Sequence, residues 1–273
     1  MSAAVFLCVA AATARPGDAV EVLGAEARHA SVQRLGVGER VELVDGRGAR
    51  ASGVVNEASP ERLSVLIDAV AVDDDPEIVL VQALAKAGRD EQAIEAATEL
   101  GATRIVPWAA ARCVVQWRGP KADKARASWA DRVTAAAKQS RRARVPEVDA
   151  CVTTSELAAM VAAAVARGAL AVVLHEEESA PLAFSTVRGE PLQPLWFIVG
   201  PEGGISDDER AALVAAGAVA ARLGPYVLRT SSAGPAAIAA AAALRGTWAA
   251  AALRGTWAAA ALRGTWADGH SAP

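Results

Sequence analysis

The hydrophobic pattern of the chain changes abruptly at an acidic stretch that ends in proline, residues 73 to 76. Before it, the segments DAVEVL, ERVELVDG, ARASGVV and RLSVLIDAV alternate apolar and polar residues between Gly, Asp-Gly and Pro. This alternation predicts short strands with one buried face, as in a small barrel or sandwich. After it, IVLVQAL is a continuous apolar run, typical of a strand covered on both faces. We therefore expect a β domain over residues 1–72 and a second domain over residues 77–248.

The second domain shows strands alternating with helices. Helical spacing of Ile94, Ala97 and Leu100 predicts a helix before Gly101, and further helices are expected over 121–142, from Ser155 to Gly168, and over 206–216. The segments between them, TRIVP, ARCVVQW, LAVVLHE, LWFIVG and ARLGPYVLRT, read as strands. Such alternation predicts an α/β fold with a mostly parallel sheet.

Composition excludes little by itself. The net charge of −3 gives no global sign of nucleic acid, and the three cysteines form no CxxC pair, so no zinc site is expected. The N-terminal AAVFLCVAAATA has the length of a signal-peptide core, but no Lys or Arg precedes it and turn chemistry follows, which favours a first strand. A cytoplasmic location is expected.

A glycine-rich loop follows a predicted strand in FIVGPEGGISDDE, residues 197–209. Ser206 and Glu209 fit a capping box, so a helix should begin near Asp207. The glycines match neither phosphate-binding pattern, and three acids already occupy the positive end of the helix dipole. The loop is therefore either a tight structural turn or a cradle for a neutral or cationic ligand. The carboxyl ends of three predicted strands, at LHE, VGPEGG and LGPYVLRT, should converge there, which favours a ligand.

The segments LVQALAK, ATELGATRIVP, AAAKQSRRARVPEV, FIVGPEGGIS and LGPYVLRTSSAG together resemble the bacterial 16S ribosomal RNA uracil-N3 methyltransferases of the SPOUT superfamily. The resemblance runs from about residue 5 to residue 248. It implies a PUA-like β-barrel that binds RNA, a SPOUT α/β domain with a trefoil knot, and a homodimer. It also implies methylation of N3 of a uridine in 16S ribosomal RNA, with S-adenosylmethionine as cofactor.

The resemblance places the cofactor against the ends of the three converging strands. The implied cofactor-binding residues are Leu174, His175, Glu176, Val199, Gly200, Pro201, Glu202, Gly203, Gly204, Leu223, Gly224, Leu228, Arg229 and Thr230. A cation near O2 or O4 of uracil would stabilise the negative charge that develops when N3 loses its proton, and Arg229 is the first candidate. Glu202 would act as a base or would offset the positive sulfonium.

The segment from Arg118 to Arg144 holds nine basic residues and two acids, within an acidic protein. Such polarisation is typical of a surface that follows phosphates, although a solvated helix face is the simpler alternative. The residues expected to contact RNA are Arg112, Lys138, Arg141, Arg142 and Arg144, with Arg28, His29 and Arg34 of the barrel as a weaker group. Two readings stay open beside the main one: a SPOUT enzyme acting on tRNA or 23S ribosomal RNA, and an RNA-binding protein whose pocket is vestigial.

The sequence departs from the family pattern at three places. Ala110 and Ala111 stand where the family has a hydroxyl residue and a glutamate, and RHASVQRL is one residue shorter than expected. The C-terminus repeats AAALRGTWA three times with a nine-residue period, which on a helix turns each copy to the opposite side. We interpret residues 249–273 as a repeat-expanded tail without a function of its own; the rival reading is an oligomer-stabilising helix.

Overall fold

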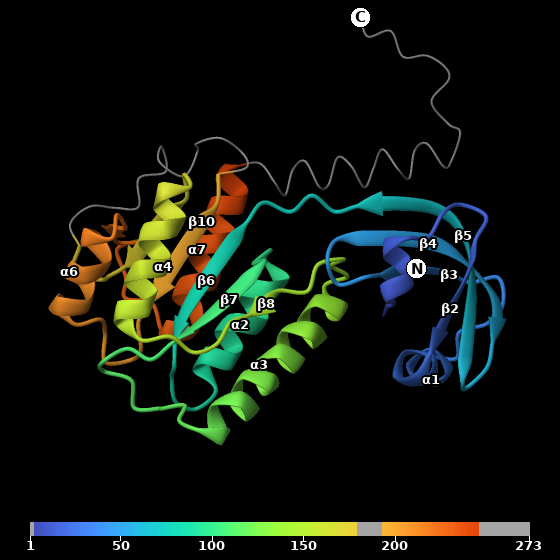
Figure 1. Cartoon of the computed structure of the whole chain (residues 1–273), viewed down its shortest axis with the longest axis horizontal. Coiled ribbons are helices and arrows are strands. Elements are labelled where there is room, and N and C mark those ends of the chain that lie inside the picture. Colours follow the sequence, from blue (N-terminus) through green and yellow to red (C-terminus); the bar gives the residue numbers. More distant parts are fainter. Residues whose placement is uncertain (1–2, 179–192, 246–273) are drawn as a thin grey trace, which may run out of the picture.

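The computed structural model describes residues 3–178 and 193–245. Two sheets lie side by side in Figure 1: one built from the first 72 residues and one built from residues 78–221. The C-terminal repeats lie outside the described residues, so the interpretation of residues 249–273 stays a prediction. None of the helices within the described residues combines the length and the apolar character that a membrane span needs.

The first sheet has the strand order β1-β3-β4-β5-β2. Its members are β1 (Ala4–Leu7), β2 (Ala19–Leu23), β3 (Arg40–Val44), β4 (Ala49–Ala58) and β5 (Arg62–Val72), with a 3-10 turn, η1 (Val9–Ala12), and a helix, α1 (Gly24–Val32). β1 pairs with β3 in parallel and the other pairs are antiparallel. The buried residues of these strands, among them Phe6, Leu43 and Ile67, form a core of their own.

The second sheet has the order β11-β9-β10-β6-β7-β8, and every pair in it is parallel. Its strands are β6 (Ile78–Ala83), β7 (Arg104–Trp108), β8 (Glu147–Val148), β9 (Leu170–Leu174), β10 (Leu195–Val199) and β11 (Val219–Ala221). The helices are α2 (Arg89–Glu99), α3 (Pro120–Gln139), α4 (Thr154–Ala166), α6 (Asp207–Ala215) and α7 (Thr230–Leu244). The predicted mostly parallel α/β sheet is confirmed.

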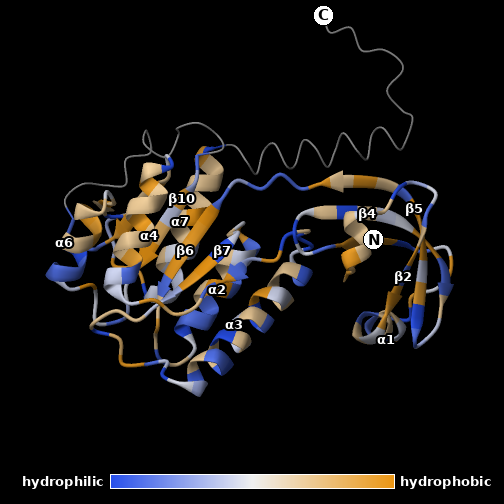
Figure 2. Cartoon of the chain, viewed as in Figure 1, coloured by the Kyte–Doolittle hydropathy of each residue, from blue (hydrophilic) through white to orange (hydrophobic). Residues whose placement is uncertain are grey.

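The apolar runs of β6 and β10 are buried along their whole length, because helices cover both faces of this sheet. Both strands are coloured mostly as hydrophobic in Figure 2. Continuous apolar sequence without alternation is what burial on both faces requires. The inner strands are therefore rigid supports for the loops at their ends.

Helix α3 leads from the second sheet to the first (Figure 1). Near its C-terminal end, Lys138 forms an ion pair with Glu26 of α1, with 2.6 Å between Nζ and Oε1. The Arg50 guanidinium donates to the backbone oxygen of Arg141, and Val5, Val44 and Ala143 form a small apolar cluster beside it. Both polar and apolar contacts thus join the two parts of the chain.

Three of the predicted elements are wrong in detail. Of the ARLGPYVLRT segment only Ala221 belongs to a strand, as the last residue of β11, and the residues from Leu223 to Arg229 form an irregular loop. The ARCVVQW segment is an irregular loop, although Cys113, Val115 and Trp117 do pack on the core. Alternating burial indicates only that one side is covered, and a loop lying over a core produces the same pattern as a strand. The helix predicted to start at a Ser155 cap instead begins at Thr154, with Thr153 as N-cap in a capping box with Glu156.

Candidate functional site

The glycine-rich loop connects β10 to α6 as predicted. Ser206 caps α6 and its hydroxyl accepts from the Glu209 backbone N–H, while the Glu209 carboxylate accepts from the Ser206 N–H. A Cβ atom on Gly200 would lie 2.5 Å from Cγ1 of Ile205, and one on Gly203 would lie 3.1 Å from Cβ of Arg112. The loop needs glycine at these positions because its backbone passes so close to its neighbours.

The Glu209 carboxylate holds this loop against two other segments. It is almost fully buried and accepts hydrogen bonds from the Ala111 N–H at 2.7 Å and from the Thr154 hydroxyl at 2.8 Å, besides those from Ser206. Burial raises the pKa of Glu209, but these hydrogen bonds outweigh burial and leave the pKa below its ordinary value. The carboxylate is therefore ionised and fixed in place.

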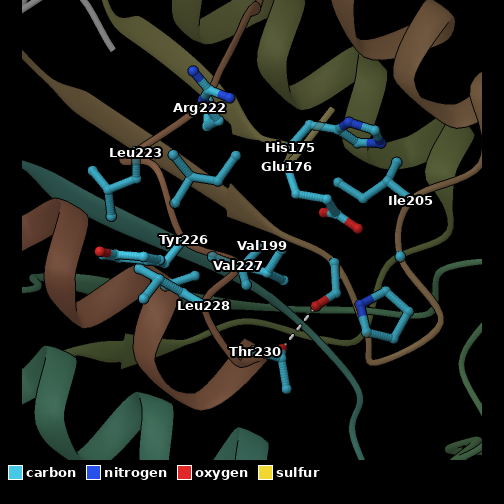
Figure 3. A pocket seen from close by; sticks show the side chains of 15 residues that line it. His175, Glu176, Val199, Ile205, Arg222, Leu223, Tyr226, Val227, Leu228 and Thr230 are labelled. Carbon is cyan, nitrogen blue, oxygen red and sulfur yellow. Dashed lines mark hydrogen bonds between the residues drawn. The ribbon is translucent and has the colours of Figure 1, made fainter. Parts of the chain in front are cut away.

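The Thr230 hydroxyl forms a second connection, between β6, α7 and the glycine loop. It accepts from Nε2 of the buried Gln82 at 2.9 Å and donates to the Gly200 carbonyl at 2.7 Å. This last bond is the dashed line in Figure 3. The start of α7 is thereby held against the start of the loop.

A hollow opens where the ends of β9, β10 and β11 meet, with a volume of about 550 Å³ that includes space open to solvent. Figure 3 shows the Glu176 carboxylate extending into this hollow, with Leu223, Tyr226, Val227 and Leu228 along its opposite wall. The residues that line it are Leu174, His175, Glu176, Val199, Gly200, Pro201, Gly204, Ile205, Arg222, Leu223, Tyr226, Val227, Leu228, Thr230 and Ala233.

The structure brings together ten of the fourteen cofactor-binding residues expected from the sequence, namely Leu174, His175, Glu176, Val199, Gly200, Pro201, Gly204, Leu223, Leu228 and Thr230. Glu202, Gly203, Gly224 and Arg229 do not line the hollow. Ile205, Arg222 and Ala233 line it outside the expected segments. Each directly adjoins an expected segment or lies one helical turn beyond it, so proximity in sequence was the available signal.

The two expected catalytic residues are placed differently from each other. The Glu202 carboxylate accepts from the Lys86 N–H at 3.1 Å and lies 3.5 Å from the Arg89 guanidinium, so it is held by the loop that follows β6. Arg229 is the N-cap residue of α7 and is exposed; among the described residues its side chain has no ion-pair or hydrogen-bond partner. Its guanidinium is therefore available to an incoming ligand.

The residues expected to contact RNA fall into three groups. Arg28, His29, Arg34 and Arg141 are exposed, while Lys138 is half-buried in its ion pair. Arg112 is exposed too and donates to the Gly203 carbonyl at 3.0 Å, at the edge of the hollow. Arg142 is turned inward, to the carbonyls of Thr98 and Ala102 and to Asp75, and therefore serves the fold. Arg144 is half-buried, and its Nε is buried without a hydrogen-bond partner among the described residues.

Comparison with known proteins gives the class. Residues 73–242 match the family model of an RNA methyltransferase domain, and residues 22–68 match that of an RNA methyltransferase PUA domain. The fold and the hollow are thus those of an RNA methyltransferase that carries a PUA domain. The predicted PUA-like and SPOUT-type architecture is confirmed, and its trefoil knot stays a prediction.

Three similar proteins from different bacteria share one name. The chain is 44% identical over 235 residues to ribosomal RNA small subunit methyltransferase E of Mycobacterium bovis, with 85% of this chain and 89% of the relative covered. It is 29% identical to the Bacillus subtilis protein of that name, covering 78% of this chain and 85% of that relative. The crystal structure of the Neisseria gonorrhoeae protein of that name, bound to S-adenosyl methionine, is 27% identical with a TM-score of 0.77, covering 89% of this chain and 98% of that one. The chain belongs to the ribosomal RNA small subunit methyltransferase E family.

Proposed function

We propose that this enzyme transfers a methyl group from S-adenosylmethionine to N3 of a uridine in 16S ribosomal RNA, in the cytoplasm. The observation that carries the proposal is the hollow at the meeting point of three strand ends, lined by apolar side chains and one inward-pointing carboxylate. The relatives are named for methylation of small-subunit ribosomal RNA, and one of their structures holds S-adenosyl methionine.

The hollow fits a cationic ligand with an apolar part better than it fits a polyphosphate. Glu176 contributes negative charge, α6 begins with its own acids, and Arg222 is the one cation among the residues that line the hollow. The walls offer Leu223 and Val227 to an aromatic ring, while the glycine loop exposes backbone N–H and C=O groups. The glycine loop, Glu176 and the 223–228 segment would hold S-adenosylmethionine, which when bound supplies the methyl group on a sulfonium.

The chemistry that the chain must add is the removal of the N3 proton, because neutral uracil carries a hydrogen there. A cation beside O2 or O4 stabilises the anion as it forms. Arg229 is the candidate because it is exposed, lies between Leu228 and Thr230, which both line the hollow, and is unpaired among the described side chains. Glu202, held by Lys86 and Arg89, serves to fix the loop or to accept the proton.

Two further properties belong to the proposal. The RNA would run along the exposed basic residues from Arg112 over α3 toward His29 and Arg34, since phosphates attract such a surface. A homodimer would cover the loop above the hollow, where Tyr226 and Val227 are 82% and 75% exposed. Exposed apolar side chains in one run are typical of an interface.

The proposal is tested by mapping 16S ribosomal RNA by mass spectrometry in cells with and without this gene. Loss of one N3-methyluridine in the deletion strain, restored by the wild-type gene, is the expected result. An unchanged level of N3-methyluridine would contradict 16S ribosomal RNA as the substrate. Loss of a methylated base from tRNA or 23S ribosomal RNA in the deletion strain would identify that RNA as the substrate instead. Calorimetry with S-adenosylmethionine tests the cofactor separately: absence of binding heat would support a vestigial pocket.

The Arg229→Ala variant tests the mechanism. Because Arg229 does not line the hollow, the variant should keep most of its affinity for S-adenosylmethionine while methyl transfer falls by roughly 10²- to 10³-fold, the usual effect of removing one stabilising donor. Turnover at the wild-type rate would remove Arg229 from the mechanism.

A further inference from the structure

A second cleft lies between the first turns of α2 and α3, outside the hollow described above. Its volume is about 820 Å³, including space open to solvent, and its lining includes Val115, Trp117, Lys121 and Lys124 on one side and Asp90 and Glu91 on the other. Trp117 packs edge-on against the buried Trp129, with ring centroids 4.9 Å apart and planes at 78°. The Trp117 ring is therefore held in one orientation while part of it stays exposed.

The acidic side chains of this cleft already have partners, whereas its lysines do not. Both Asp90 oxygens accept backbone N–H groups, from Ala85 and Glu91, and the Glu91 carboxylate forms an ion pair with Arg132 at 2.8 Å. By contrast, Lys121 and Lys124 are exposed and have no hydrogen-bond or ion-pair partner among the described residues. The cleft thus has satisfied acids on one wall and two unpaired cations on the other.

The cleft and the hollow are joined by two segments. In the loop before α3, Arg112 contacts Gly203 beside the hollow, and Val115 and Trp117 line the cleft a few residues later. In the loop after β6, Ala85 lines the cleft and the neighbouring Lys86 N–H binds Glu202 of the glycine loop. The cleft and the edge of the hollow therefore lie only a few residues apart along both segments.

We infer that the cleft is a second nucleotide subsite, in which an unpaired RNA base next to the methylated one stacks on Trp117 while its phosphate contacts Lys121 and Lys124. Aromatic stacking suits any base and needs only an exposed, fixed ring. The lysines attract the phosphate, and the carboxylates on the α2 wall keep it on the α3 side. The inference rests on the proposed function, since it takes RNA as the substrate.

The test compares full-length variants for binding to an unmethylated 16S ribosomal RNA transcript in a filter assay. Trp117→Ala should weaken binding roughly tenfold, within the range that loss of one base stack produces, and Trp117→Phe should restore most of it. Lys121→Ala and Lys124→Ala should each make the negative slope of log affinity against log salt shallower by about 0.7, as expected for one lost phosphate contact. Arg167→Ala, which removes an exposed cation at the end of α4, is the matched control and should change neither quantity.

Each variant is also tested for S-adenosylmethionine binding, which should stay at the wild-type level because the cleft does not touch the hollow. In methyl transfer, Trp117→Ala should raise KM for RNA and change kcat little. Wild-type RNA affinity in Trp117→Ala would overturn the inference. A changed oligomeric mass in that variant would instead show that the cleft is an interface with a second copy of the chain. A wild-type chain that binds the transcript but does not methylate it would contradict the proposed function alone, and the binding comparison would still decide on the subsite.

Discussion

At the scale of single residues, the hydroxyl of Thr230 fixes one wall of the hollow. Substitution by valine keeps the shape but removes the hydroxyl that donates to the Gly200 carbonyl, and it leaves the Gln82 amide with only its bond to the Ala83 carbonyl. We expect Thr230→Val to lower the free energy of unfolding by about 1–3 kcal/mol and to weaken S-adenosylmethionine binding. Urea denaturation and calorimetry measure the two effects. Thr230→Ser, which keeps the hydroxyl, should show neither; equal losses in both variants would contradict the role of the hydrogen bonds.

Glu209 provides a residue-scale prediction that depends on pH. Its carboxylate only accepts hydrogen bonds, so a glutamine would turn its own N–H₂ toward some of the donors that surround it. At pH 7, Glu209→Gln should lower the free energy of unfolding by about 1–3 kcal/mol.

The pKa of Glu209 is lowered in the folded chain, so its stabilisation is complete above the ordinary glutamate value of 4.5. It is lost as the pH falls through the lower folded pKa, and the difference between wild type and variant should shrink there. Urea midpoints measured between pH 7 and pH 3 would show this. Asp208→Asn, at an exposed position in the same first turn, is the control, with an expected change of a few tenths of a kcal/mol. A difference that grows at low pH would contradict the assignment.

At the scale of elements, Gly53 sets how β4 crosses β5. A Cβ atom there would lie 2.3 Å from the backbone oxygen of Leu66, at a point where the register between the two strands shifts. Backbone cannot move aside as a side-chain tip can, so Gly53→Ala should lower the free energy of unfolding by about 1–3 kcal/mol. Gly36→Ala, whose nearest atom is 3.7 Å away, should be close to neutral by the same chemical denaturation. Equal effects at both positions would contradict the clash with Leu66 and would attribute the change to the conformational entropy of glycine in the unfolded chain.

The elements themselves were largely predictable, for a local reason. Apolar runs identified β6 and β10, and the Ser206–Glu209 pair identified the start of α6, because burial and capping depend on neighbours in sequence. The helix α1 was not predicted: its sequence lacks an apolar face, and it is held by packing of Ala27 and Ala30. The 111–117 loop was misread for a related reason, since its burial comes from a core built by other segments.

At the scale of the whole molecule, Arg142 links segments that are distant in sequence. Its guanidinium binds carbonyls at the end of α2 and also Asp75, between the two sheets, whereas its neighbour Arg141 projects into solvent. Arg142→Ala should lower the free energy of unfolding by roughly 2–3 kcal/mol, because buried acceptors lose a charged donor. Arg141→Ala should leave stability unchanged and weaken RNA binding. Thermal melts measure the loss of stability and the filter assay measures RNA binding. An equal loss of stability in both variants would contradict the assignment of Arg142 to the fold and Arg141 to RNA binding.

The same pair shows where prediction from the sequence ends. The charge run from Arg118 to Arg144 was visible in the sequence, but which of its cations face inward depends on the carbonyls of Thr98, in the last turn of α2, and of Ala102, just after that helix. Likewise, the convergence of three strand ends followed from the α/β pattern, while the turning of Glu202 toward Lys86 did not. Long-range partners decide such orientations, and a single sequence does not record them.

The position of β10 also governs when the protein can fold during its synthesis. This strand lies between β9 and β6, so two strands that are made earlier join only through one that is made later. While the ribosome is still translating the residues before Leu195, β6 and β9 each present an unpaired apolar edge to the cell. The first sheet, complete by Val72, has no such delay. Newly made chains therefore pass through a stage with a finished N-terminal part and an open C-terminal one, and the unpaired strand edges expose them most to aggregation at that stage.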